Sequence, residues 1–286
     1  MSVQLGAMTL PFRGYSYERG LEGVAEAGFR YVCVGLPHEG RGVPHQDDEP
    51  SAFARAVEQA RSRGLDPVMF FCLAHAHQAG GEEAWLKAVE RTSQAGIPFI
   101  LSMGTSSYLP GFTGKRPHCD QAADEARWAE VMRRAAERAE TAGVTILVKP
   151  HTGNTATAVE CRQTLQLVDS PALAVCYDAG NVRFYEGVDP TADLPLIADR
   201  VRGLCLKDHA GPRFHMDFPP PGDGCVDHAA LFRILAAAGF SGPMMIERVD
   251  GRDDAAGMEY GEIVRRLARS RERMQAALLS AGLKPA

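Results

Sequence analysis

One short pattern recurs along this chain: a helical stretch, then a glycine, then a run of apolar residues. It reads VAEAGFRYVCVG, EQARSRGLDPVMFF, RTSQAGIPFILSM, AETAGVTILV and LAAAGFSGPMMIE. Each glycine fits the position after a helix, where a left-handed residue ends the last turn; they are Gly28, Gly64, Gly96, Gly143 and Gly239. The runs that follow are continuous rather than alternating, which is typical of parallel strands covered on both faces.

The pattern predicts strands near residues 3–8, 30–35, 67–73, 98–103, 144–150, 173–178, 202–207 and 243–247. Helices are predicted between them, near 17–27, 51–63, 82–95, 120–142, 154–168, 189–200, 226–238 and 257–281. This alternation favours an α/β fold, a single (β/α)8 TIM barrel, over an open sheet. A doubly wound sheet is the alternative, but no G-x-G-x-x-G follows the first strand, so we expect no nucleotide cofactor. No composition break divides residues 1–286, which predicts one domain.

Composition and charge limit the classes of binding partner that we expect for this chain. The formal net charge is −5 and no basic stripe occurs, which argues against nucleic acid or an anionic membrane surface. No run of about 18 apolar residues could span a bilayer, and the N-terminal sequence does not read as a signal peptide. The 7 cysteines lack C-x-x-C spacing and several lie in apolar runs, which indicates reduced core thiols. We expect a soluble cytoplasmic protein with a small-molecule partner; its Arg-rich last helix is a candidate homo-oligomer contact.

Polar residues stand where the predicted strands end, which is the face that holds the active site in such barrels. The fifth strand ends in Lys149 and leads to His151; the sixth ends in Asp178 and leads to Asn181. The seventh ends at Lys207, and the eighth at Glu247. Further polar residues follow the third and seventh strands and lie in the Pro-rich segment 212–224, a candidate pocket loop: His75, His77, Asp208, His209, Arg213 and His215.

Lys149, Asp178 and Glu247 are predicted to form one charged cluster at the barrel mouth. Two carboxylates brought together need a cation between them, or one of them holds its proton. A divalent metal is one such cation, and the ammonium of Lys149 or Lys207 is another. Carboxylates, amines and imidazoles can move protons next to a carbonyl, so either arrangement suits chemistry on a polyol. A purely structural ion pair between Asp178 and Lys149 is the alternative.

The chain resembles the xylose isomerase-like TIM-barrel superfamily, the sugar phosphate isomerase/epimerase group. The resemblance covers nearly the whole chain and is densest in ILVKPHTG, YDAGN, LCLKDH and PPPGDGCVDHAALFRILAAAGFSGPMMIER. It implies a sugar or keto-sugar isomerase or epimerase. It also implies a divalent metal (Mn, Mg, Co or Zn) held by Glu, Asp, His and Glu from the last four strands. Asp178 and Glu247 match two of these ligands.

The other two family ligands are replaced in this sequence. Lys149 stands where the fifth-strand Glu is expected, and Cys205 where the seventh-strand His is expected. Asn181 replaces the histidine three residues after the aspartate. A protonated lysine cannot ligate a metal and repels it. If a metal is bound, His151 or His209 should compensate; if none is bound, the lysine supplies the positive charge.

These patterns yield one leading hypothesis, an isomerase- or epimerase-like enzyme that transfers a proton next to a sugar carbonyl. The predicted catalytic residues are Lys149, Glu247, His151 and Lys207. The predicted substrate-binding residues are His75, His77, Asn181, Asp208, Arg213 and His215. Asp178, Glu247 and His209 are the candidate metal ligands. The alternatives are a sugar lyase or aldolase using Lys149 as a Schiff base, and a non-catalytic sugar-binding barrel that lost the family metal site.

Overall fold

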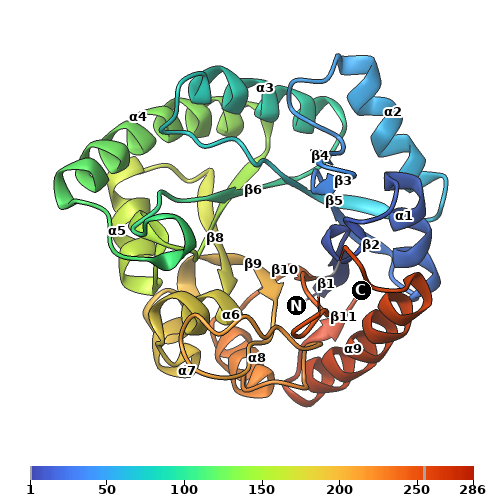
Figure 1. The fold of residues 1–286 in the computed structure, drawn as a ribbon. Helices are drawn as coiled ribbons and strands as arrows, with labels where there is room; N and C mark the ends of the chain where they lie inside the picture. The colour runs from blue at the N-terminus through green and yellow to red at the C-terminus, as the bar shows by residue number, and fades with distance from the viewer. Residues whose placement is uncertain (1, 254–255) are drawn as a thin grey trace.

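The computed structural model describes residues 2–253 and 256–286, and within them eight parallel strands close into a barrel (Figure 1). The strands are β1 (Ser2–Met8), β2 (Tyr31–Val34), β5 (Asp66–Phe71), β6 (Phe99–Met103), β7 (Thr145–Lys149), β8 (Leu173–Asp178), β9 (Val201–Leu206) and β10 (Gly242–Ile246). They pair in chain order, and β10 pairs with β1 to complete the ring. The predicted TIM barrel is confirmed.

Helices surround the barrel and alternate with its strands (Figure 1). The longer ones are α1 (Tyr17–Glu26), α2 (Pro50–Arg61), α3 (Gly81–Gln94), α4 (His118–Ala142), α5 (Ala158–Val168), α8 (His228–Ala237) and α9 (Tyr260–Ser280). All five glycines of the repeated pattern have positive φ, between 69° and 83°, just after helices. A glycine adopts this conformation without the steric cost of a Cβ atom, which confirms their role in ending helices.

The helix predicted near 189–200 is wrong as one continuous element. The chain leaves β8 through α6 (Ala179–Asn181) and a π-helical turn, Val182–Glu186. It then forms α7 (Pro190–Asp193) and the short 3-10 turns Leu194–Leu196 and Ala198–Arg200. Pro195 explains the break, because proline lacks the N–H that continues a helix and clashes with the preceding turn.

Three short strands were not predicted. Strands β3 (Pro37–His38) and β4 (Arg41–Gly42) pair as a small antiparallel ribbon after β2. Strand β11 (Lys284–Pro285) lies parallel to the start of β1, so the C-terminal segment adds to the sheet beside the N-terminus (Figure 1). Each spans two residues, which is too short for hydrophobic periodicity to reveal.

The core has two layers. One lies between strands and helices, and the other fills the barrel with side chains that include Met69, Leu101, Leu147 and Met245. Cys33, Cys176 and Cys205 belong to this interior layer, as predicted for core thiols, whereas Cys119 and Cys225 are exposed. Among the described residues, no helix has the length and hydropathy needed to cross a membrane. The filled interior leaves the strand ends as the place for a site.

Candidate active site

Four charged side chains meet at the carboxyl ends of the last four barrel strands. Lys149 is the final residue of β7 and Asp178 that of β8, while Lys207 and Glu247 directly follow β9 and β10. The Lys149 Nζ lies 2.9 Å from both carboxylate oxygens of Glu247 and 3.4 Å from Asp178 Oδ2. The Lys207 Nζ lies 3.2 Å from Asp178 Oδ2 and 3.0 Å from Glu247 Oε1. We call these four residues the charged cluster.

The charged cluster is buried and balanced. Asp178 is fully buried, and the other three side chains belong to residues that are 2–5% exposed. Burial disfavours the ammonium form of Lys149, but Glu247 and Asp178 outweigh it and hold the lysine pKa well above its usual range. Burial alone would raise the pKa of Glu247, yet the two lysines bring it well below normal. Burial raises the pKa of Asp178 in spite of the lysines.

Asn181 directly precedes the π-helical turn and forms hydrogen bonds with two residues of the charged cluster. Its backbone N–H donates to Asp178 Oδ1 at 2.9 Å, and its side-chain amide donates to the Pro150 carbonyl at 2.8 Å. The amide oxygen accepts from Lys207 Nζ at 2.8 Å. Sequence reasoning placed Asn181 at the substrate, whereas the structure gives its polar groups partners inside the protein.

His151 sits beside the charged cluster and pairs with Tyr185. Its Nε2 lies 2.8 Å from the Tyr185 hydroxyl oxygen, and its Nδ1 lies 3.5 Å from Thr152 Oγ1. The Thr152 hydroxyl donates to the Thr105 carbonyl, so its oxygen is free only to accept from Nδ1–H. Tyr185 then donates to an unprotonated Nε2. Burial first, and then Lys149 and Lys207, lower the His151 pKa to about 3, which keeps the imidazole neutral.

A cavity of about 580 Å³ opens at the mouth above β5, β6 and β7, a volume within the range of ligand pockets. His75, His77 and His151 line it together, so the structure brings the predicted histidines of the third and fifth strands to one space. Arg116 and Asp124, paired at 2.6 Å, give it a polar side. Apolar and aromatic residues also line the cavity: Met103, Tyr108, Leu109, Pro110 and Phe112.

The predicted residues after the seventh strand hold a loop together. The Asp208 carboxylate accepts backbone N–H groups from Gly222, Gly224 and Val226 at 2.9–3.0 Å, and from His209. Its oxygens are thus committed to segment 208–226, and a direct substrate contact by Asp208 has no support in this geometry. Because these bonds and His228 outweigh burial, the pKa of Asp208 is lowered.

His209, His215 and Arg213 lie in that same segment. His209 Nε2 is 2.9 Å from the His215 carbonyl, and the His215 ring lies 3.1 Å from the Ala210 carbonyl. Arg213 reaches across the mouth, where it donates to the Tyr108 hydroxyl and pairs with Glu186. The structure therefore assigns these three residues contacts within the loops, and it does not bring His209 to the charged cluster.

Several residues near the site were missed by sequence reasoning. Tyr185 lies in the π-helical turn, and Phe218 and Arg248 stack at 4.1 Å beside the charged cluster, with Lys207 Nζ 5.8 Å from the Phe218 ring. Aromatic residues in loops carry no periodic signal, so only their position shortly after strand ends could have indicated them. The position of Arg248, next to Glu247, was such a signal.

The candidate metal ligands fit a divalent ion poorly. Ligand atoms of Asp178, Cys205 and Glu247 lie within 4.8 Å of one another, the group among the described residues that could hold a metal. Both Glu247 oxygens and Asp178 Oδ2, however, face the ammonium groups of Lys149 and Lys207. Burial raises the Cys205 pKa well above normal, which keeps the thiol protonated, whereas metal binding needs the thiolate.

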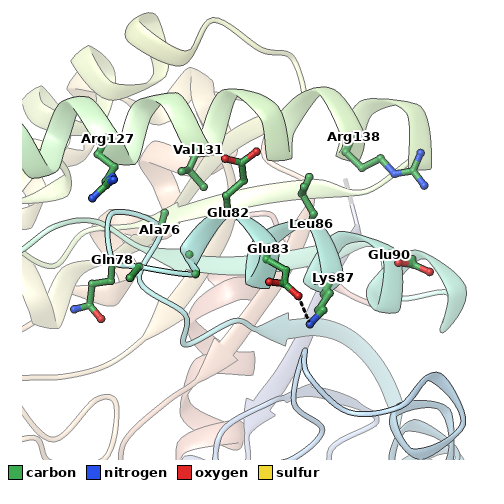
Figure 2. Close-up of a pocket in the computed structure, with 13 residues that line it drawn as sticks. Ala76, Gln78, Glu82, Glu83, Leu86, Lys87, Glu90, Arg127, Val131 and Arg138 are labelled. Carbon is green, nitrogen blue, oxygen red and sulfur yellow. Dashed lines mark ion pairs between the residues drawn. The ribbon is translucent and has the colours of Figure 1, made fainter.

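Another cavity, of about 710 Å³, lies on the outer surface between α3 and α4 (Figure 2). Leu86 and Val131 form its apolar part, and Arg127 and Arg138 project from α4 beside it (Figure 2). Lys87 pairs with Glu83 at 2.7 Å at its edge. His75, His77 and His151 line the mouth cavity, and the residues that line this surface cavity include none of the predicted site residues.

Comparison with known proteins agrees with the barrel fold. The profile of the xylose isomerase-like TIM barrel family matches residues 21–270. The chain belongs to this family. An inosose dehydratase from Geobacillus kaustophilus is 27% identical over 167 residues, 52% of this chain and 54% of that protein; one from Clostridium beijerinckii is 26% identical over 156 residues. The match spans about half the length of each curated relative.

Solved structures share the fold at low sequence identity. An L-ribulose 3-epimerase superposes with a TM-score of 0.74 at 16% identity, covering 99% of this chain and 96% of the other. A D-allulose 3-epimerase from Methylomonas sp. gives 0.74 at 17% identity, covering 97% and 98%. At these identities the similarity establishes the fold.

Proposed function

We propose that this chain is an enzyme that acts on a keto-sugar or keto-polyol by removing a proton next to the carbonyl at the barrel mouth. The observation that carries the proposal is the charged cluster: two ammonium groups and two carboxylates at four strand ends. His151, two residues after Lys149, lines the neighbouring cavity together with two further imidazoles. Such preorganised charges stabilise a developing enediolate, which is the main demand of this chemistry.

The charged cluster offers distinct roles to its members. Glu247 is ionised and is the proton acceptor, while Lys207 stabilises the oxygen that gains charge. The Nδ1–H of neutral His151, whose contact with Thr152 is long at 3.5 Å, is the donor through which that imidazole can assist. The lysines make Glu247 a weak base in the free enzyme. When a substrate oxygen takes up part of the Lys207 interaction, Glu247 loses some of that stabilisation and becomes a stronger base. Lys149 then holds the carboxylate in place.

The relatives narrow the reaction to two related outcomes. The structural neighbours are named as 3-epimerases of ketoses, and the curated relatives as inosose dehydratases. Epimerisation beside a carbonyl and loss of water from a keto-polyol can share one first step, proton removal alpha to the carbonyl. The dehydratase relatives favour the second candidate, in which the intermediate expels a β-hydroxyl group protonated by a lysine.

A Schiff-base mechanism at Lys149 is less well supported. Its Nζ is within 3.4 Å of three carboxylate oxygens, and its pKa is raised, so the amine keeps its proton and lacks the free lone pair that attacks a carbonyl. We therefore expect no borohydride-trapped adduct at Lys149 with any keto-sugar that the enzyme turns over.

Three arginines near the mouth are already paired with carboxylates, which favours a substrate without phosphate. Arg116 pairs with Asp124, Arg213 with Glu186, and Arg248 with Asp250. Each guanidinium is thus already neutralised by a carboxylate, whereas recognition of a phosphate relies on unpaired, preorganised cationic donors.

The test is proton exchange measured by NMR in D2O. Purified protein is incubated with L-ribulose, D-allulose and an inosose, and deuterium at the carbon beside the carbonyl is followed together with any dehydration product. We expect exchange on at least one of them, lost in Glu247→Gln. Glu262→Gln, on the outer helix α9, is the matched control and should keep full activity. Tyr185→Phe serves as a milder site variant if Glu247→Gln does not fold.

No exchange or dehydration with any of these compounds would refute the proposal. Binding without turnover, seen as a ligand-dependent rise in Tm, would instead favour a sugar-binding barrel. Unchanged turnover in both site variants would show that the chemistry takes place elsewhere.

A further inference from the structure

We infer that the ammonium groups of Lys149 and Lys207 together take the place of a divalent cation between Asp178 and Glu247, and that removing Lys149 creates a metal site there. The inference rests on the proposed function only for its catalytic consequence. Its structural part concerns which cation the two carboxylates hold, and it can be tested without a substrate.

The geometry already satisfies the carboxylates. Lys149 Nζ contacts both oxygens of Glu247 at 2.9 Å, and Lys207 Nζ adds a contact of 3.0 Å to one of them. Asp178 Oδ2 faces both ammonium groups, at 3.2 and 3.4 Å, and its Oδ1 accepts the Asn181 N–H. A metal bound at about 2 Å would have to occupy the space that Lys149 Nζ fills.

The net charge of the cluster also disfavours a bound divalent ion. Two ammonium groups and two carboxylates sum to zero in a site that solvent hardly reaches. Adding a divalent ion would leave two uncompensated positive charges in a buried region, which is strongly unfavourable. Replacing Lys149 with a neutral residue reverses the balance, because two carboxylates then face one ammonium and the cluster carries one net negative charge.

Cys205 supplies the third donor for the site that this replacement would open. Its Sγ lies 3.6 Å from Cys176 Sγ, and the ligand atoms of Asp178, Cys205 and Glu247 are already within 4.8 Å of one another. A divalent ion in the vacated volume would promote loss of the thiol proton, since metal binding and thiolate formation are linked. A thiolate with two carboxylates suits Zn²⁺ or Co²⁺ better than Mg²⁺.

The experiment measures metal content. Wild type, Lys149→Gln and the surface control Lys87→Gln are stripped with EDTA, equilibrated with Co²⁺ or Zn²⁺, desalted and analysed by inductively coupled plasma mass spectrometry. We expect metal far below one ion per chain in wild type and in Lys87→Gln, and about one ion per chain in Lys149→Gln. The cobalt form of Lys149→Gln should show thiolate-to-cobalt absorption in the near ultraviolet, lost in Lys149→Gln/Cys205→Ala.

The outcomes separate this inference from the proposed function. Stoichiometric metal in wild type, or proton exchange that requires an added metal, overturns the inference and leaves the proposed function standing. Folded Lys149→Gln that binds no metal also overturns it. A metal-free wild type that turns over nothing refutes the function alone. If Lys149→Gln does not fold by circular dichroism, Lys207→Gln opens the same carboxylates and provides the test.

Discussion

The Tyr185 hydroxyl oxygen lies 2.8 Å from Nε2 of His151, so the π-helical turn after β8 contacts a residue that lines the cavity and stands two positions after Lys149. Burial raises the pKa of the phenol, so it stays protonated and donates. The contact fixes the imidazole in one tautomer. Tyr185 is thus a positioning residue for His151.

Tyr185→Phe should lower kcat on the proton-exchange substrate by roughly tenfold to a hundredfold, because small misplacements of a reacting group are costly. KM should change little. NMR of labelled histidine should show His151 in a mixture of tautomers, a readout that a general loss of stability would not produce.

Tyr177→Phe is the matched control for this change. The Tyr177 hydroxyl donates to buried Asp193 at 2.8 Å, away from His151. Its removal should lower the free energy of unfolding by about 1 kcal/mol and leave the His151 tautomer unchanged. Equal effects of both variants on His151 would contradict a specific role for Tyr185.

The depressed pKa of His151 makes stability depend on pH. Its folded-state pKa is about 3, against an ordinary value near 6.5. Between these two pH values the imidazole is protonated in the unfolded chain but stays neutral in the folded chain. The stabilisation is complete above about pH 6.5 and falls as the pH drops toward 3. Urea unfolding between pH 7 and 4 should show wild type losing stability relative to His151→Gln. Parallel curves for the two proteins would contradict the shifted pKa.

Asp208→Ala should release the loop after β9. The carboxylate accepts four backbone N–H groups, and its loss leaves them without this acceptor; two of them, on His209 and Val226, are buried. We expect a loss of about 3 kcal/mol in the free energy of unfolding and faster proteolysis within 212–224. Asp227→Ala removes the exposed cap of α8 and should cost only about 1 kcal/mol, with the loop still protected. Equal proteolysis in the two variants would refute this role for Asp208.

The repeated pattern of helix, glycine and apolar run predicted the barrel because each part of it depends on neighbouring residues alone. The glycines mark helix ends, and the continuous apolar runs mark strands that are buried on both sides. The strand ends of the charged cluster followed from that register, and Lys149, Asp178, Lys207 and Glu247 do meet in space. The role of Asp208 in holding its loop could not be predicted from the sequence, since the loop residues that it binds lie 14 to 18 positions away in a segment without periodicity. Tyr185 was hidden for the same reason.

Two loops are held together across the mouth by polar contacts and a stacked pair of aromatic rings. The Tyr108 hydroxyl donates to Glu186 at 2.8 Å and accepts from Arg213, while Phe112 stacks on Phe214 with ring centroids 4.9 Å apart. Both phenylalanines have positive φ, 57° and 63°, a strained conformation for a bulky residue. Such strain persists only while neighbouring contacts hold it, so loss of the hydroxyl should loosen both loops.

Tyr108→Phe should therefore increase amide hydrogen exchange in segments 104–116 and 211–218 by about tenfold, the effect of roughly 1.4 kcal/mol on local opening. KM should rise more than kcat falls, because Tyr108 and Phe112 line the cavity but lie outside the charged cluster. Tyr17→Phe is the control: its hydroxyl donates to the Ala56 carbonyl between α1 and α2, so it should leave exchange at the mouth unchanged. Unaltered exchange in Tyr108→Phe would show that ring stacking alone holds the loops closed.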